Sequence, residues 1–148
     1  MNFVNEINHF YSRMSLYELQ VMKDGDGFSG LSYNSALYIN VIDQMEACTV
    51  SKIAQALCVT KSAVTLKINE LEKLGAVVRV RSDTDKRVFY IKLSKEMTDV
   101  MSFYHGVFGR IGEELKKSYT AEQIALFSEI LHQISAFEWR KIGTGKED

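Results

Sequence analysis

Proline is absent from this 148-residue chain, and cysteine occurs only twice, as Cys48 and Cys58. A chain without proline suits a helix-dominated fold, in which glycine has to mark the breaks. The two cysteines form neither a CxxC pair nor a zinc spacing, so we expect structural thiols in a reducing compartment. No apolar run approaches the roughly 18 residues of a membrane span, and the N-terminus lacks the pattern of a secretory signal. These absences predict a cytoplasmic protein without a membrane segment.

Net charge is also small, at -1 for the whole chain, but it is distributed unevenly. Residues 50–95 hold ten Lys and Arg against four Asp and Glu, which gives +6 and leaves -7 for the remainder. Such polarity is typical of a basic face that meets phosphates. A solvated surface of mixed charge remains the alternative on charge alone. With 46% hydrophobic residues, the chain has enough apolar material for one globular domain with its own core.

The first segment, residues 3–21, repeats apolar residues at steps of four and three, which predicts a helix with one apolar face. Its members are Phe3, Ile7, Phe10, Met14, Tyr17 and Val21. The glycine-rich segment 24–30 ends this helix. It matches GxGxxG, but a dinucleotide site needs a strand before it, and a calcium loop needs an oxygen ligand where Phe28 stands. We therefore interpret the segment as a connection between helices.

Two helices follow, each preceded by a residue suited to cap it. Ser32 begins a core helix that runs to about Glu46. Its apolar residues are Leu37, Val41 and Met45 on one face, with Tyr38 and Ile42 beside them. Thr49 or Ser51 begins a short helix, which ends in a tight connection at 58–59.

The next helix begins after Thr60 and ends at Lys73 and Gly75, a cation near the negative end of the helix and then a residue free to adopt a left-handed conformation. Helical periodicity turns Val64, Ile68 and Leu71 inward. The residues left to face outward are Lys61, Ser62, Thr65, Leu66, Lys67 and Asn69.

From Ala76 the apolar period changes from 3.6 to 2, which predicts two strands around the polar turn 82–86. In the first strand, Val78 and Val80 alternate with Arg79 and Arg81. In the second, Phe89, Ile91 and Leu93 alternate with Val88, Tyr90 and Lys92. We expect a β-hairpin with one apolar face, built on Phe89, Ile91 and Leu93, and a basic tip.

The C-terminal third predicts two long helices. Ser94 or Thr98 begins the first, and Thr120 with Gln123 forms a capping box for the second. Their apolar lines are Met97, Met101, Tyr104, Phe108, Ile111 and Leu115, and then Ile124, Phe127, Leu131 and Ile134 up to Glu138. One chain of this size would struggle to cover these faces and that of residues 3–21, so we expect a dimer interface. An intramolecular bundle is the alternative.

These patterns predict a mainly α fold with a two-stranded wing in a single domain, 1–148. Residues 48–94 form the winged helix-turn-helix, and 1–47 and 95–142 supply helices for the core and for dimerisation. The segment IAQALCVTKSAVTLKINELEKLGAVVR resembles the helix-turn-helix of the MarR family of bacterial transcriptional regulators, with Leu71, Glu72 and Gly75 at its end. The segment SDTDKRVFYIKLS is similar to the wing of that family, at Asp85, Arg87, Leu93 and Ser94.

The resemblance implies a homodimer that binds pseudo-palindromic double-stranded DNA, usually as a repressor. The second helix of each helix-turn-helix enters the major groove, and the wing reaches toward the minor groove. The residues expected to contact DNA are Thr60, Lys61, Ser62, Thr65, Leu66, Lys67, Asn69, Arg81, Asp85, Lys86 and Arg87.

Physical chemistry assigns roles within this set. The start of the helix after Thr60 presents free N–H groups to a phosphate. Leu66 is suited to contact a thymine methyl group. Arg87 is expected in a narrow minor groove, with Asp85 or Asp83 holding its guanidinium in a bidentate pair, while Arg81 and Lys86 bind phosphates. The alternative is that Asp85 and Arg87 form only an exposed turn pair.

A small-molecule effector is expected to release the DNA, and aromatic residues suggest its pocket: Tyr11, Met14, Tyr33 and Tyr38. Ordinary core positions are the alternative for these four. Peroxide-sensing members of the family carry a reactive cysteine near the start of the first helix, where this chain has none. Burial is expected to keep Cys48 and Cys58 unreactive.

No metal or other cofactor is expected, because His9, His105 and His132 are scattered singly. The alternative, which the resemblance implies, is that two or more of them meet at the dimer apex and bind zinc. Catalytic motifs are missing too: the sequence has no nucleophile elbow, P-loop, HExxH or paired carboxylates, which argues against an enzyme. The second hypothesis is a winged-helix module whose basic face binds an acidic protein rather than DNA.

Overall fold

The helices and strands follow the order expected from the periodicity of the sequence. The computed structural model describes residues 2–24 and 31–137. Within them lie α1 (Phe3–Asp24), α2 (Tyr33–Gln44), α3 (Val50–Leu57), α4 (Lys61–Lys73), β1 (Val77–Arg81), β2 (Phe89–Leu93), α5 (Lys95–Lys116) and α6 (Ala121–Ala136). The strands form an antiparallel pair, so the predicted mainly α fold with a two-stranded wing is confirmed. The glycine-rich segment and Glu138 lie outside the described residues.

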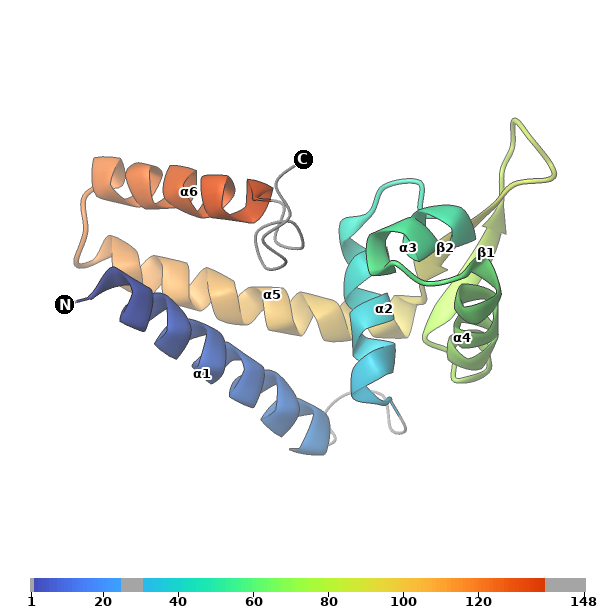
Figure 1. The fold of residues 1–148 in the computed structure, drawn as a ribbon, viewed down its shortest axis with the longest axis horizontal. Coiled ribbons are helices and arrows are strands. Elements are labelled where there is room, and N and C mark those ends of the chain that lie inside the picture. The colour runs from blue at the N-terminus through green and yellow to red at the C-terminus, as the bar shows by residue number, and fades with distance from the viewer. Residues whose placement is uncertain (1, 25–30, 138–148) are drawn as a thin grey trace, which may run out of the picture. The chain divides into compact units, whose positions relative to one another are not determined.

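The chain divides into two compact units, residues 1–103 and 104–148, and the division falls within α5. The first unit contains the helix-turn-helix and the hairpin (Figure 1). Figure 1 shows β1 beside α4, and the connection between β1 and β2 extends away from the helices of this unit. The residues predicted to contact DNA all belong to the first unit.

Side-chain caps begin the helices of the first unit as predicted. The hydroxyl oxygens of Ser32, Thr49 and Thr60 accept hydrogen bonds from backbone N–H groups three residues later, at 3.1, 3.3 and 3.2 Å. Each bond satisfies a donor that has no partner inside the helix. Ser94 does the same for α5, where it accepts from the N–H of Met97 at 3.1 Å. These are local bonds, which explains why the sequence predicts them well.

Two left-handed residues shape the helix-turn-helix and its exit. Cys58 ends α3 with φ 53° and ψ 44°, and the N–H of Val59 returns to the carbonyl of Ala54 at 3.0 Å. This is the tight connection expected at 58–59. Gly75 ends α4 with φ 75°, and the N–H of Ala76 donates to the carbonyl of Leu71 at 2.9 Å. The predicted left-handed glycine is therefore confirmed, and it turns the chain directly into β1.

The hairpin buries only part of the predicted set, because Ile91 is buried and Leu93 packs against the core whereas Phe89 does not. Val77 pairs with Leu93, Arg79 with Ile91 and Arg81 with Phe89. Residues directly opposite share a face, so Val77 and Ile91 face the core, at 1% and 2% exposure. The prediction was wrong for the inward-facing residues of the first strand and for Phe89. Val78, Val80 and Phe89 are exposed by 42%, 39% and 46%.

The core joins α2, α3, α4, the hairpin and the start of α5. Its most deeply buried apolar side chains are Ile53, Val64, Ile68, Leu71, Val77, Ile91 and Met97. The inward face predicted for α4 is confirmed. The prediction for α2 was wrong at Leu37, which is 41% exposed, because the helix instead buries Ser35, Tyr38, Ile39 and Ile42. Val41 and Met45 pack at the edge of this core.

The terminal helices leave their apolar side chains open within the single chain. On α1, Phe3 is 65% exposed and Phe10 61%. In the second unit, Phe108 of α5 and Phe127 of α6 are each 51% exposed, and α6 begins with the predicted capping box at Thr120. Among the described residues, no helix combines the length and apolar character needed to cross a membrane.

Candidate nucleic-acid interface

The start of α4 is an exposed helix N-terminus without acidic residues. Thr60 caps it, Lys61 and Ser62 are exposed, and the first turn contains no Asp or Glu. The partial positive charge of the helix end and the charge of Lys61 therefore add to the positive potential of the same exposed surface. An anion such as a phosphate meets no repulsion from the first turn of this helix.

The outward face of α4 carries small polar groups and one leucine. Ser62, Thr65, Leu66 and Asn69 are exposed as predicted, and Leu66 is exposed by 70%. The Thr65 hydroxyl donates to the carbonyl of Lys61 at 2.9 Å, so it offers its lone pairs outward. The prediction that Lys67 faces outward was wrong, while its contact with DNA stays a prediction. Its side chain is only 16% exposed, and its ammonium lies 2.7 Å from a carboxylate oxygen of Glu70.

A network between α4 and β1 escaped the sequence prediction. One guanidinium nitrogen of Arg79, Nη1, pairs with Glu72, and the other, Nη2, donates to Oδ1 of Asn69 at 2.6 Å. Arg79 thus crosses from the strand to the exposed face of the helix. Arg79 lies opposite Ile91, on the same face of the hairpin as Val77, and is only partly exposed. Its partners depend on the hairpin register, which the alternation of arginine and valine in VVRVR leaves open.

The wing tip holds the predicted pair of Asp85 and Arg87. Oδ1 of Asp85 accepts from the backbone N–H of Arg87 at 3.0 Å and from its Nε at 3.3 Å, while Oδ2 accepts from Nη2 at 3.4 Å. The backbone bond and then the guanidinium hold the pKa of Asp85 below its ordinary value. Asp85, rather than Asp83, therefore orients the arginine, whose side chain remains 91% exposed.

The base of the wing is organised by Arg81. Its Nε donates to the carbonyl of Lys86 at 2.7 Å, and its guanidinium carbon lies 5.8 Å from the centre of the Phe89 ring. Ser82 accepts from the N–H of Asp85 at 3.3 Å and closes the turn from the inside. Arg81 therefore braces the loop that carries Lys86 and Arg87, in addition to any contact it makes with a phosphate.

The two cysteines differ in environment. Cys48 is 2% exposed, and burial raises the pKa of its thiol, with a smaller opposing effect from Lys52. Cys58 is exposed, so the prediction that burial protects both thiols was wrong for this residue. Its left-handed position at the end of α3 turns it away from the core. In the described part of the chain, no group of three or more His, Cys, Asp and Glu residues is placed to hold a metal ion.

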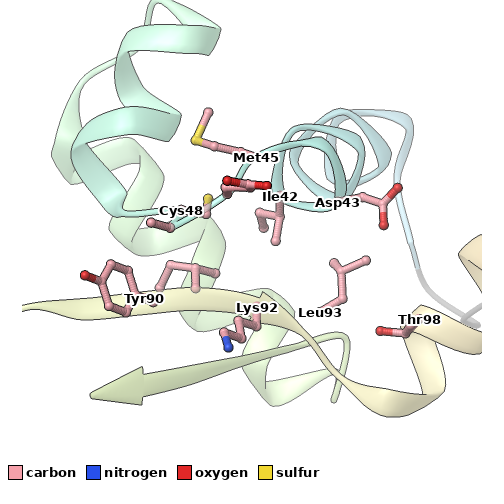
Figure 2. A pocket seen from close by; sticks show the side chains of 11 residues that line it. Ile42, Asp43, Met45, Cys48, Tyr90, Lys92, Leu93 and Thr98 are labelled. Atoms are coloured by element: carbon pink, nitrogen blue, oxygen red, sulfur yellow. The ribbon is translucent and has the colours of Figure 1, made fainter. Parts of the chain in front are cut away.

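A hollow of about 330 Å³ lies behind the hairpin, between the end of α2, strand β2 and the start of α5 (Figure 2). Its lining includes Ile42 and Met45 at the end of α2 and Tyr90, Lys92 and Leu93 of β2, and of these strand residues Leu93 points toward Ile42. The backbone N–H of Ile91 donates to the carbonyl of Cys48 at 2.8 Å. This bond ties the segment before α3 to the wing strand, so the hollow borders both elements.

The four residues predicted to line an effector pocket do not border this hollow. Tyr38 is buried in the core at 5% exposure, as the alternative interpretation of this residue expects. Tyr11 and Tyr33 are exposed by 71% and 48%. Met14 is partly buried on α1. An effector site formed by these four residues stays a prediction.

Residues 31–89, from just before α2 to the first residue of β2, match the model of the MarR family. The chain resembles this family over these 59 of its 148 residues. The chain is 28% identical over 91 residues to the uncharacterized HTH-type transcriptional regulator YwhA of Bacillus subtilis. It is also 28% identical over 93 residues to the HTH-type transcriptional regulator FarR of Neisseria gonorrhoeae.

The matched stretches cover 56% and 58% of this chain and 66% and 59% of those relatives. The chain thus spans less than two thirds of the length of either relative. Among solved structures, it shares its fold with FabT of Streptococcus pneumoniae in complex with DNA. The TM-score is 0.62 at 23% identity, covering 97% of this chain and 99% of that one.

Proposed function

We propose that this chain is a member of the MarR family and a sequence-specific regulator of transcription that binds double-stranded DNA. The observation that carries the proposal is the first unit's combination of an exposed helix face on α4 and an oriented, 91% exposed arginine at the wing tip. An α-helix fits the major groove, and an arginine at a wing suits a narrow minor groove. The DNA complex of FabT supports this use of the shared fold. The proposed role is binding rather than catalysis.

We propose that the functional form is a homodimer bound to a pseudo-palindromic operator. We propose that it acts as a repressor in the bacterial cytoplasm. The exposed apolar residues of α1, and separately those of the second unit, support a second copy as the partner. Two copies related by a two-fold axis match the symmetry of two half-sites. A small-molecule effector that weakens DNA binding completes the proposal.

The experiment for DNA binding begins with duplexes selected by the full chain from a random-sequence pool. Fluorescence anisotropy then measures affinity for a selected and an unrelated duplex as salt is varied. Counterion release predicts a loss on the order of a thousandfold between about 50 and about 200 mM salt. A chain that enriches no duplex, or binds both duplexes with no dependence on salt, contradicts the proposal. If the chain still binds an acidic protein in the presence of excess competing DNA, the result favours the alternative of a protein-binding module.

The dimer is tested by sedimentation. The wild-type chain should sediment as a particle of twice its 16.9 kDa mass. Phe10→Asp, on the exposed apolar face of α1, should shift the mass to that of one chain and weaken binding to the selected duplex. Val78→Asp is a matched control, because this valine is also exposed but lies on β1. A single-chain mass for the wild type at micromolar concentration contradicts the homodimer.

A further inference from the structure

The amide of Asn69 has a defined orientation. Its Oδ1 accepts a hydrogen bond from Nη2 of Arg79 at 2.6 Å, and a guanidinium can only donate, so the oxygen must be the atom that faces the strand. The amide nitrogen, on the other branch of the same planar group, then points away from Arg79. No partner for this nitrogen occurs among the described residues. Asn69 therefore offers a hydrogen-bond donor on the exposed face of α4, while its oxygen is turned toward Arg79.

Leu66 lies next to this donor. Residues three apart are neighbours on a helix surface, so Leu66 and Asn69 share one strip of α4. The Leu66 side chain is 70% exposed, although it is apolar and can make no hydrogen bond to solvent. Glu70 and Glu72, the two acids of this helix, are already paired with Lys67 and Arg79. The strip thus presents an apolar group and a donor side by side, with its carboxylates neutralised.

Each base offers a different pattern in the major groove. Thymine has a methyl group beside the O4 acceptor, guanine has two acceptors, and cytosine has an amino donor. Adenine combines an acceptor with a donor, and asparagine recognises it by using both of its amide atoms. Asn69 presents its donor to the helix face, because its oxygen is turned toward Arg79 and already accepts one hydrogen bond there. Of the four bases, thymine matches an apolar group next to a donor.

We propose that Leu66 and Asn69 together recognise a thymine in each half-site, and that Arg79 is the positioning residue that restricts Asn69 to this choice. Leu66 contacts the C5 methyl group, and the amide nitrogen of Asn69 donates to O4. Glu72 holds the other branch of the arginine in place. This inference rests on the proposed DNA-binding function and specifies the base that the α4 face selects.

The experiment uses a duplex selected by the wild-type chain, in which thymines are replaced one at a time. Deoxyuridine removes only the methyl group. At one position in each half-site it should weaken binding about fourfold, the effect of one buried methyl group. For Leu66→Ala the same replacement should have no further effect. Val78→Ala, which truncates an exposed valine on β1, should keep the fourfold loss.

A second replacement tests the donor. A 5-methylcytosine paired with guanine keeps the methyl group but exchanges O4 for an amino donor, so the wild type should lose about fivefold or more. Asn69→Asp retains a partner for Arg79 and presents an acceptor instead, and it should prefer 5-methylcytosine over thymine there. Arg79→Ala frees the oxygen of Asn69 and should admit adenine at the same position. A purely structural arginine would change the thermal midpoint but leave this base preference alone.

The outcomes separate the two proposals. A chain that selects no duplex refutes DNA binding itself. A chain that binds its selected duplex but tolerates deoxyuridine at every thymine, or whose Leu66→Ala variant shows the same fourfold loss, refutes the thymine assignment alone. If Arg79→Ala does not fold, Asn69→Asp still decides the case, because an unchanged preference for thymine overturns the proposal.

Discussion

Replacing Arg87 with alanine should separate DNA affinity from folding. The side chain is 91% exposed, and among the described residues its guanidinium contacts only the carboxylate of Asp85. An exposed ion pair of this kind contributes little to stability, so the thermal midpoint of Arg87→Ala should stay close to that of the wild type. A change confined to binding is therefore the expected result.

The size of the binding effect follows from the bonds that an arginine makes to DNA. Loss of one charge-assisted hydrogen bond to DNA should lower the binding affinity about tenfold. A dimer that loses this bond in both wings should bind about a hundredfold less tightly. The slope of log affinity against log salt should also fall by about two for the dimer, roughly one for each lost contact. Anisotropy titrations of a selected duplex at several salt concentrations measure both quantities.

Two further variants identify what Arg87 contributes. Arg87→Lys keeps the charge and so should keep the salt slope, but it loses the planar fork that Asp85 orients and should bind less tightly. Asp85→Asn removes the ionic partner and should cause a smaller loss than Arg87→Ala. Because the pKa of Asp85 is lowered, the pair is present above that pKa and is lost only as the pH falls through it. The wing should consequently add no pH dependence to binding near neutrality.

The result that refutes this account of the wing is specific. If Arg87→Ala binds the selected duplex within about twofold of the wild type, with an unchanged salt slope, then the arginine has no contact with DNA. The exposed pair would then be only a turn contact, which was the alternative on the sequence alone. If affinity falls together with the thermal midpoint, the loss reflects folding, and the direct role is equally refuted.

Three predictions concern the scaffold and the thiols. Leu71→Ala should destabilise the chain by about 3 kcal/mol in urea unfolding, because its side chain is fully buried, whereas Leu66→Ala on the same helix should change stability by less than about 0.5 kcal/mol. Thr60→Ala should cost about 1 kcal/mol by removing the cap of α4, and Thr60→Ser should restore it; equal stability of the two would contradict the capping role. Ellman's reagent should modify one thiol per native chain, Cys58, while Cys48 reacts only after unfolding, since its pKa is raised and its sulfur is buried. Two thiols reacting at the same rate in the native chain would contradict that assignment.

The sequence predicts well whatever depends on neighbouring residues. Thr60 and Thr120 cap helices through bonds to N–H groups three residues away, and Gly75 adopts the left-handed conformation that the end of α4 requires. Asp85 and Arg87 are two residues apart, so their pairing also follows from local geometry. None of these contacts depends on how distant segments pack.

The errors arise where packing over a distance decides the outcome. VVRVR contains two adjacent valines, so alternation alone leaves the inward one undecided. The bond from Ala76 to Leu71 fixes the entry of the strand and turns Val77 inward. Phe89 is exposed because it pairs with Arg81 at the far end of the hairpin, beyond the core, where it lies under the guanidinium. Sequence periodicity contains neither the strand register nor the position where the core ends.

Contacts within the first unit link α4 to the wing. Arg79 joins β1 to α4 through Glu72 and Asn69, while the N–H of Ile91 joins β2 to the segment before α3 at the carbonyl of Cys48. The side chains that would recognise bases and the arginine at the wing tip therefore share a frame and cannot turn independently without breaking these bonds. For the proposed effector to release DNA from within the first unit, we expect it either to displace α4 and the wing together or to break one of these two links. The hollow behind β2 borders the second link, so a molecule bound there would act on the wing and on α3 together.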